Sequence, residues 1–155
     1  MTILVQAYRS CLRTRLKSLI GNVPGWVLDD ITERGWRGFG WQWLKRRIAE
    51  YIAECLGKIG AKSVYLVELH GGEHIVEDFG DKDIDLLVEC GADCGWSDDL
   101  DSVTENTVAE ILGEMLGANP YRVLGVPNIV EIHVIGRSYV ARHVGDSYAR
   151  PIKLL

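Results

Sequence analysis

Two apolar runs of strand length, separated by a glycine pair and an acidic connection, constrain this chain more than any other feature. They lie within residues 63–90. The first run, 64–69, is rich in β-branched and aromatic residues and stops before Gly71 and Gly72. The second run, 84–88, follows the acidic connection. The pattern predicts two strands joined by a connection that begins with exposed backbone.

Two aspartates flank the start of the second run. Asp83 and Asp85 are two residues apart, so on an extended backbone both carboxylates project from one face. Ile84, Leu86 and Val88 then point the other way, into a core. A glycine turn that ends one strand and an Asp-x-Asp that opens the next suggest a phosphate-binding turn facing a metal site.

Elsewhere the hydrophobic spacing is mainly helical. Apolar stripes predict helices over 4–20, 26–34, 41–59 and 102–116. Two further strands are expected, a short one over 121–126 and a clear one over 128–135. Helices followed by strand–strand–helix–strand indicate an α+β (α/β-like) fold, a small mixed sheet packed on helices.

The chain of 155 residues has the length of one compact unit. We divide it into an N-terminal helical extension, residues 1–40, and an α/β core, residues 41–155. Charge is divided differently: residues 1–60 hold ten Lys/Arg and five Asp/Glu, whereas residues 61–155 hold seven and seventeen. Bound divalent metal would relieve this concentrated negative charge, although ordinary solvation of surface loops accounts for most of it.

The last strand contains a third acidic candidate. Glu131 alternates with Val130 and Ile132 in an otherwise apolar run, where an unpaired charge is costly, so it needs a partner or a metal. His133 lies on the same face as Glu131. It either shares a metal or substrate contact with Glu131 or is a hydrogen-bonded, partly buried histidine.

The segment HGG…KDIDLLVEC resembles the signature of the nucleotidyltransferase superfamily, especially its minimal members. Gly71 stands at the family glycine, Asp83 follows twelve residues later, and Asp85-Leu-Leu-Val completes the second half. The resemblance covers residues 45–90 and extends loosely to residue 135.

This resemblance implies a metal-dependent enzyme that transfers a nucleoside monophosphate from a nucleoside triphosphate to an acceptor. The acceptor would be a small molecule, a nucleic acid or a protein. Asp83, Asp85 and Glu131 would be the catalytic metal ligands, holding Mg²⁺ or Mn²⁺. Gly71 and Gly72 would contact the nucleotide phosphates.

Three positions depart from the family pattern. Gly72 replaces the usual serine and removes a hydroxyl that would bind phosphate. Lys82 replaces a serine before the first aspartate, and as a nucleotide-binding residue it would contact phosphate. Glu131 replaces an aspartate, and its longer side chain would reposition any metal.

The departures leave a second hypothesis open, a catalytically weakened module that binds a protein or nucleic acid. Its surface would be the tryptophan-rich basic part of the helices, which contains Trp36, Arg37, Trp41, Trp43, Lys45, Arg46 and Arg47. The same residues also fit a packing corner with a solvated basic face. A homo-oligomer or a helical partner protein is a further alternative. A purely structural acidic domain would leave Glu131 unexplained.

Other types of site have weaker support in the sequence. The aspartates around Asp83 begin a calcium-loop pattern, but Leu86 occupies its required glycine. His70 and His74 are expected on a loop. The cysteines lack a zinc pattern, and we expect thiols, with a Cys90–Cys94 loop disulfide as the alternative. With no secretory signal and no membrane-spanning apolar run, we predict a cytoplasmic protein.

Overall fold

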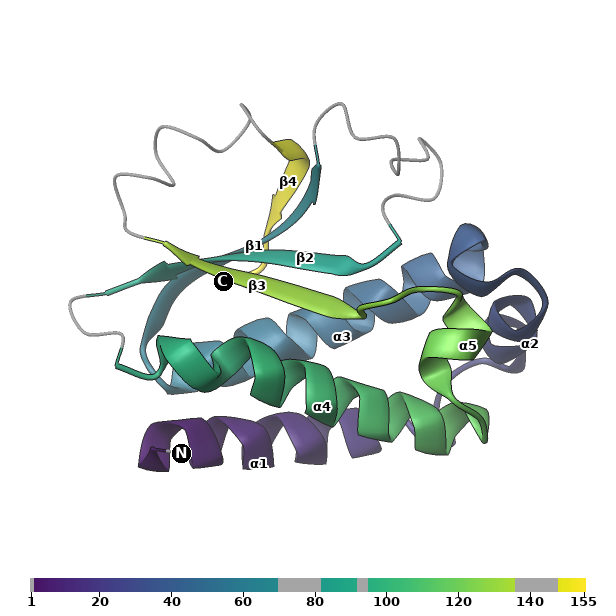
Figure 1. The fold of residues 1–155 in the computed structure, drawn as a ribbon, viewed down its shortest axis with the longest axis horizontal. Coiled ribbons are helices and arrows are strands. Elements are labelled where there is room, and N and C mark those ends of the chain that lie inside the picture. Colours follow the sequence, from purple (N-terminus) through teal and green to yellow (C-terminus); the bar gives the residue numbers. More distant parts are fainter. Residues whose placement is uncertain (1, 70–81, 92–94, 136–147) are drawn as a thin grey trace.

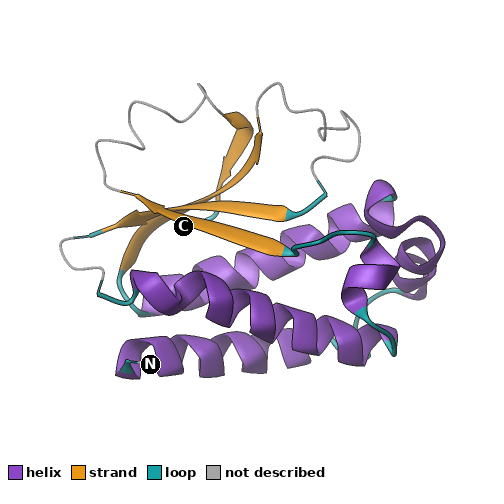
Figure 2. Cartoon of the chain, viewed as in Figure 1, coloured by secondary structure: helices purple, strands orange, loops and turns teal. Residues whose placement is uncertain are grey.

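The computed structural model describes residues 2–69, 82–91, 95–135 and 148–155. A four-stranded sheet lies over a layer of helices, and this α+β architecture confirms the expected fold class (Figures 1 and 2). The elements in chain order are α1 (Ile3–Lys17), α2 (Gly25–Arg34), the 3₁₀ helix η1 (Gly35–Arg37), α3 (Phe39–Lys58), β1 (Ala61–Leu69), β2 (Ile84–Cys90), α4 (Ser97–Leu116), α5 (Pro120–Leu124), β3 (Val130–Ile135) and β4 (Tyr148–Lys153).

The sheet has the strand order β3-β2-β1-β4. β1 is antiparallel to both β2 and β4, whereas β2 and β3 are parallel. Parallel neighbours need a crossover, and α4 with α5 supplies it beneath the sheet (Figure 1). The starts of β2 and β3 therefore lie side by side at one end of the sheet.

Alternation along the strands divides the two faces of the sheet. Ile84, Leu86 and Val88 belong to the hydrophobic core that the sheet shares with the helices, as predicted. Val130 and Ile132 join the same core from β3. The intervening residues of β2 and β3 consequently project from the face that turns away from the helices.

A disulfide links two helices of the layer. Cys11 of α1 is bonded to Cys55 of α3, 44 residues further along the chain. Cys90, at the end of β2, is also disulfide-bonded. The expectation of thiols was therefore wrong for these three cysteines. Helix packing brings Cys11 and Cys55 together although no sequence pattern connects them, whereas Cys94, the alternative partner expected for Cys90, lies outside the described residues.

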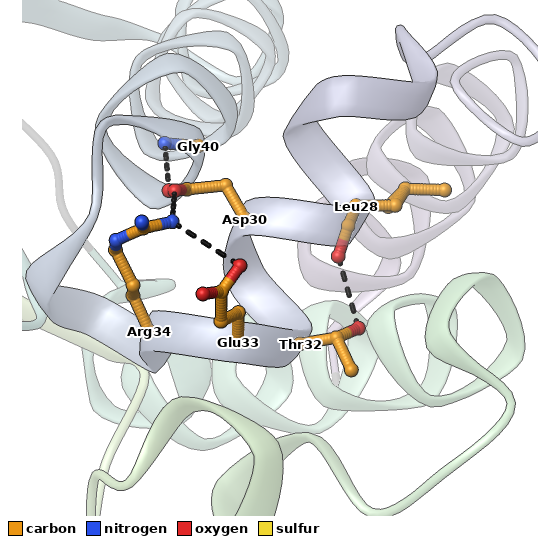
Figure 3. Close-up of polar contacts among 6 residues, drawn as sticks. All are labelled: Leu28, Asp30, Thr32, Glu33, Arg34 and Gly40. Carbon is orange, nitrogen blue, oxygen red and sulfur yellow. Dashed lines mark hydrogen bonds and ion pairs between the residues drawn. The ribbon is translucent and has the colours of Figure 1, made fainter.

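A glycine-rich turn connects α2 to α3. The Asp30 carboxylate accepts a hydrogen bond from the Gly40 amide, 2.8 Å away, in the first turn of α3 (Figure 3). It also pairs with Arg34 at 2.7 Å. A side chain at Gly38 would collide with the Asp30 carboxylate, and one at Gly40 would collide with the Val27 carbonyl oxygen, so the glycines let Asp30 reach the helix terminus.

The prediction of a short strand over 121–126 was wrong, because most of this segment belongs to the helix α5. Asn119 caps its start by accepting a hydrogen bond from the Tyr121 amide at 3.0 Å. Pro120 occupies the first turn, and Gly125 ends the helix with a positive φ of 77°. These end signals override the weak strand preference of a five-residue segment.

Two other features differ from the expectation, the start of α4 and the presence of β4. α4 starts at Ser97 rather than at residue 102, so Asp98 and Asp99 occupy its first turn, where negative charge is favourable. β4 was not expected at all.

No helix in the described ranges is both long enough and apolar enough to cross a bilayer.

Candidate metal centre at the paired starts of β2 and β3

The centre consists of two acids and a histidine on neighbouring strands. Asp85 of β2 pairs in register with Glu131 of β3, and Leu87 pairs with His133. The three polar side chains therefore project from one face of the sheet, away from the helices. One ligand atom from each of Asp85, Glu131 and His133 lies within 4.8 Å of the other two. Such a set of carboxylate oxygens and an imidazole nitrogen can coordinate a divalent cation.

The three side chains differ in exposure. Asp85 is 3% exposed and lies beside the buried residues Val67 and Leu87 on the same face. The side chains of Glu131 and His133 are 43% and 46% exposed. The His133 Nε2 atom lies 3.9 Å from the Glu131 Oε2 atom, which is beyond hydrogen-bond distance. The centre thus combines one fixed ligand with two that can adjust.

A hollow of about 560 Å³ opens between α4 and the edge strand β3. Its wall includes both Glu131 and His133, so it is continuous with the centre. The lining residues are Asp101, Ser102, Glu105, Asn106, Asn128, Val130, Glu131, Ile132 and His133. Among the described residues, the lining thus has three carboxylates and no lysine or arginine, which favours a cation and disfavours a bare phosphate.

Two of these carboxylates hold the outer edge of β3. Asp101 accepts a hydrogen bond from the Ile132 amide at 2.9 Å. Glu105 accepts hydrogen bonds from the amides of Ile129, at 2.6 Å, and Val130, at 3.2 Å. These bonds satisfy edge amides that would otherwise be available for pairing with another strand.

Glu105, in the wall of the hollow, has an altered proton affinity. Burial raises the pKa of Glu105, and the backbone hydrogen bonds from Ile129 and Val130 oppose this rise. The negative charges of Asp101 and Glu131 raise the pKa further. The three carboxylates around the hollow therefore repel one another, a condition that a bound cation would relieve.

The other predicted site residues have varied positions. Asp83 is half-buried immediately before β2 and is not one of the three clustered ligands. Lys82 is also half-buried, and its carbonyl accepts a hydrogen bond from the Trp41 Nε1 atom at 2.8 Å. Gly71 and Gly72 lie outside the described residues, as do His70 and His74.

Two of the three tryptophans in the tryptophan-rich segment are packed inside the protein. Trp41 is fully buried, and Trp36 and Lys45 are almost fully buried. Arg47 stacks on the half-buried Trp43, with its guanidinium carbon 5.2 Å from the ring centroid. Phe39 is exposed. The segment is therefore chiefly a packing corner, with a smaller aromatic and basic surface on the outside of α3.

Asp101 and Glu105 were not identified from the sequence as parts of the site. Their spacing of four places both carboxylates on one face of a helix, which was the available signal. Comparison with protein-family models, curated proteins and solved structures finds no match. The site must therefore be interpreted from its own geometry.

Proposed function

We propose that the protein is a divalent-metal-dependent nucleotidyltransferase, which transfers a nucleoside monophosphate from a nucleoside triphosphate to an acceptor. One observation carries the proposal. Asp85 and Glu131 are register partners on adjacent parallel strands, and their carboxylate oxygens are close enough to share a cation. This is the relation that the sequence resemblance requires between the Asp-x-Asp strand and the third acid.

The residues of the centre would act by position and charge. Asp85, buried and held in the strand, would fix the location of the cation, and Glu131 would close on it from the neighbouring strand. When bound, Mg²⁺ or Mn²⁺ supplies positive charge to the phosphate oxygens of the nucleotide. Without that charge, the carboxylates around the hollow would repel the triphosphate.

The remaining proposed metal and phosphate contacts come from the sequence resemblance. Asp83, two residues before Asp85, is proposed as a further metal ligand, and Lys82 as a phosphate contact. Gly71 and Gly72 would provide backbone amides for the phosphates. The acceptor stays unassigned among small molecules, nucleic acids and proteins.

Titration calorimetry with each of the four common ribonucleoside triphosphates tests this function. We expect binding with Mg²⁺ or Mn²⁺, loss of binding with a chelator, and loss in Asp85→Asn. Asp99→Asn removes an exposed carboxylate from the first turn of α4, outside the hollow, and should bind like the wild type. Absence of nucleotide binding in folded wild-type protein would refute the proposal.

A binding module is the second candidate, because α3 presents an aromatic and basic surface to solvent. Phe39, Trp43 and Arg47 follow one another at intervals of four residues, on one side of the helix. Phe39 is 58% exposed. Anisotropy with a fluorescent single-stranded oligonucleotide tests this candidate, which predicts binding that Phe39→Ala and Arg47→Ala weaken and Asp85→Asn leaves unchanged.

A further inference from the structure

We propose that His133 is a ligand of the cation and that the centre therefore selects a first-row transition-metal ion, such as Mn²⁺ or Zn²⁺, over Mg²⁺. This inference rests on the proposed function for the presence of a cation at Asp85 and Glu131. It adds a ligand that the sequence resemblance does not provide.

The first step is the availability of His133. Its Nε2 atom is 3.9 Å from Glu131 Oε2, too far for a hydrogen bond. Within the described residues, no hydrogen bond of the His133 imidazole is found. In contrast, Asp101 and Glu105 accept hydrogen bonds from β3 amides. Unlike these two carboxylates, the imidazole is not used to hold the strand, so a ring nitrogen is available to a cation.

The second step is distance. Three bonds of about 2.1 Å to one ion, at angles of about 90–120°, place the donor atoms about 3.0–3.6 Å from one another. The donor atoms of Asp85, Glu131 and His133 already lie within 4.8 Å of one another. The donor atoms must therefore approach one another by at most about 1.8 Å, and the half-exposed Glu131 and His133 side chains can make this movement by rotation.

The third step is ligand chemistry. Mg²⁺ dehydrates reluctantly and is bound through one or two carboxylates, with water in its other positions. Imidazole nitrogen favours transition-metal ions, for which two carboxylates and one histidine form an adequate set with positions left for substrate. Mg²⁺ would therefore use Asp85 and Glu131, whereas Mn²⁺ or Zn²⁺ would also gain the bond to His133.

The test measures metal binding without nucleotide, by titration calorimetry with Mn²⁺ and separately with Mg²⁺. Wild type should bind Mn²⁺ at least about tenfold more tightly than Mg²⁺. His133→Gln should weaken Mn²⁺ binding by about 10-fold to 100-fold and change Mg²⁺ binding by less than about twofold. Asn106→Ala, an exposed neutral change in the same hollow, is the matched control and should alter neither.

Spin-echo spectroscopy of bound Mn²⁺ provides a direct readout of the bond. Wild type should show modulation from a coordinated ¹⁴N nucleus, and His133→Gln should lack it. Mn²⁺ binding that depends on Asp85 but shows no ¹⁴N coupling would overturn the role of His133 and leave the proposed function intact. Mn²⁺ binding that Asp85→Asn does not change would overturn both.

Discussion

The helical layer and the paired starts of β2 and β3 use polar groups in opposite ways. In the helical layer, polar side chains join one element to another: Asp30 caps α3, and Tyr8 shares a hydrogen bond of 2.6 Å with Thr104. A disulfide fixes α1 to α3. At the strand starts, three carboxylates and an imidazole surround an open hollow, and the part of its lining that the structure describes has no lysine or arginine.

This difference predicts that the helical layer contributes mainly to stability and the strand starts mainly to ligand binding. Polar contacts with complementary partners lower the free energy of the folded state, whereas clustered carboxylates raise it unless a ligand compensates. Functional sites commonly retain such local costs. Substitutions in the helical layer should therefore change unfolding, and substitutions at the strand starts should change metal binding.

The largest effect should come from the disulfide. Cys11→Ser combined with Cys55→Ser opens a loop of 44 residues and should reduce the free energy of unfolding by about 4 kcal/mol, because the unfolded chain gains entropy. Guanidinium chloride unfolding followed by tryptophan fluorescence measures the change. Metal affinity of the folded variant should stay at the wild-type value.

The double variant under reducing conditions is compared with reduced wild-type protein, because reduction also opens the disulfide of Cys90, and the two should unfold alike. Equal unfolding midpoints for oxidised wild type and the variant would contradict the disulfide prediction.

Alkylation of thiols at the moment of cell lysis tests the predicted cellular location. Disulfides rarely persist in the cytosol, so a fully oxidised Cys11–Cys55 pair would argue against the predicted cytoplasmic location.

The next effect should come from the strand starts. Glu131→Gln should weaken Mn²⁺ binding by about 10-fold to 100-fold, equivalent to about 1.4–2.7 kcal/mol, because one anionic ligand is lost. The free energy of unfolding without metal should stay constant or rise by up to about 0.5 kcal/mol, since repulsion with Glu105 is relieved. Calorimetry and denaturant unfolding measure the two quantities.

Glu110→Gln is a matched control for that substitution. Glu110 has the same side-chain exposure as Glu131, 43%, but it pairs with Arg13 at 2.8 Å and is not part of the candidate metal centre. It should leave Mn²⁺ affinity unchanged. If both variants weaken Mn²⁺ binding equally, the loss reflects the change in net charge. The contrast between the helical layer and the strand starts would then be wrong.

A smaller effect on stability is expected at the start of α3. Asp30→Ala should lower the free energy of unfolding by about 1–2 kcal/mol, because the Gly40 amide loses its acceptor. Asp30→Asn keeps an acceptor oxygen and should cost less. Arg34→Ala removes only the exposed ion pair and should cost at most about 0.5 kcal/mol. Equal losses in Asp30→Ala and Arg34→Ala would exclude the capping role.

Alternation in the sequence was sufficient to predict the two faces of β2 and β3. The apolar residues at 84, 86 and 88 could only be buried together, which sent Asp85 to the other face. The same logic placed Glu131 and His133 on one side of β3. Their approach to Asp85 needed the strand register as well, and register depends on contacts far apart in the sequence.

Features that depend on tertiary packing were missed. The Cys11–Cys55 pairing needs α1 and α3 to lie side by side, and no spacing rule connects residues 44 apart. The roles of Asp101 and Glu105 depend on α4 lying against the outer edge of β3. In contrast, α5 had local signals at Asn119, Pro120 and Gly125, which a stricter use of helix-end rules would have detected.

The smallest effect should be the pH dependence that Glu105 contributes. Its pKa is raised above 4.5 in the folded protein, so in the interval between the unfolded and folded pKa values the folded state binds more protons. The Glu105 contribution to stability is then fully present below pH 4.5 and is lost as pH rises through the folded pKa. Unfolding of wild type and Glu105→Gln without metal, compared from pH 4 to pH 7, measures this contribution.

Glu105→Gln keeps a side-chain oxygen for the β3 amides but cannot ionise, so its stability relative to wild type should increase with pH across that interval. A difference between the two proteins that falls with pH would mean that the amide hydrogen bonds outweigh burial and repulsion. Glu105 would then stabilise the edge of β3 as an anion, and the acidic hollow would resemble the helical layer in having its charges compensated from within.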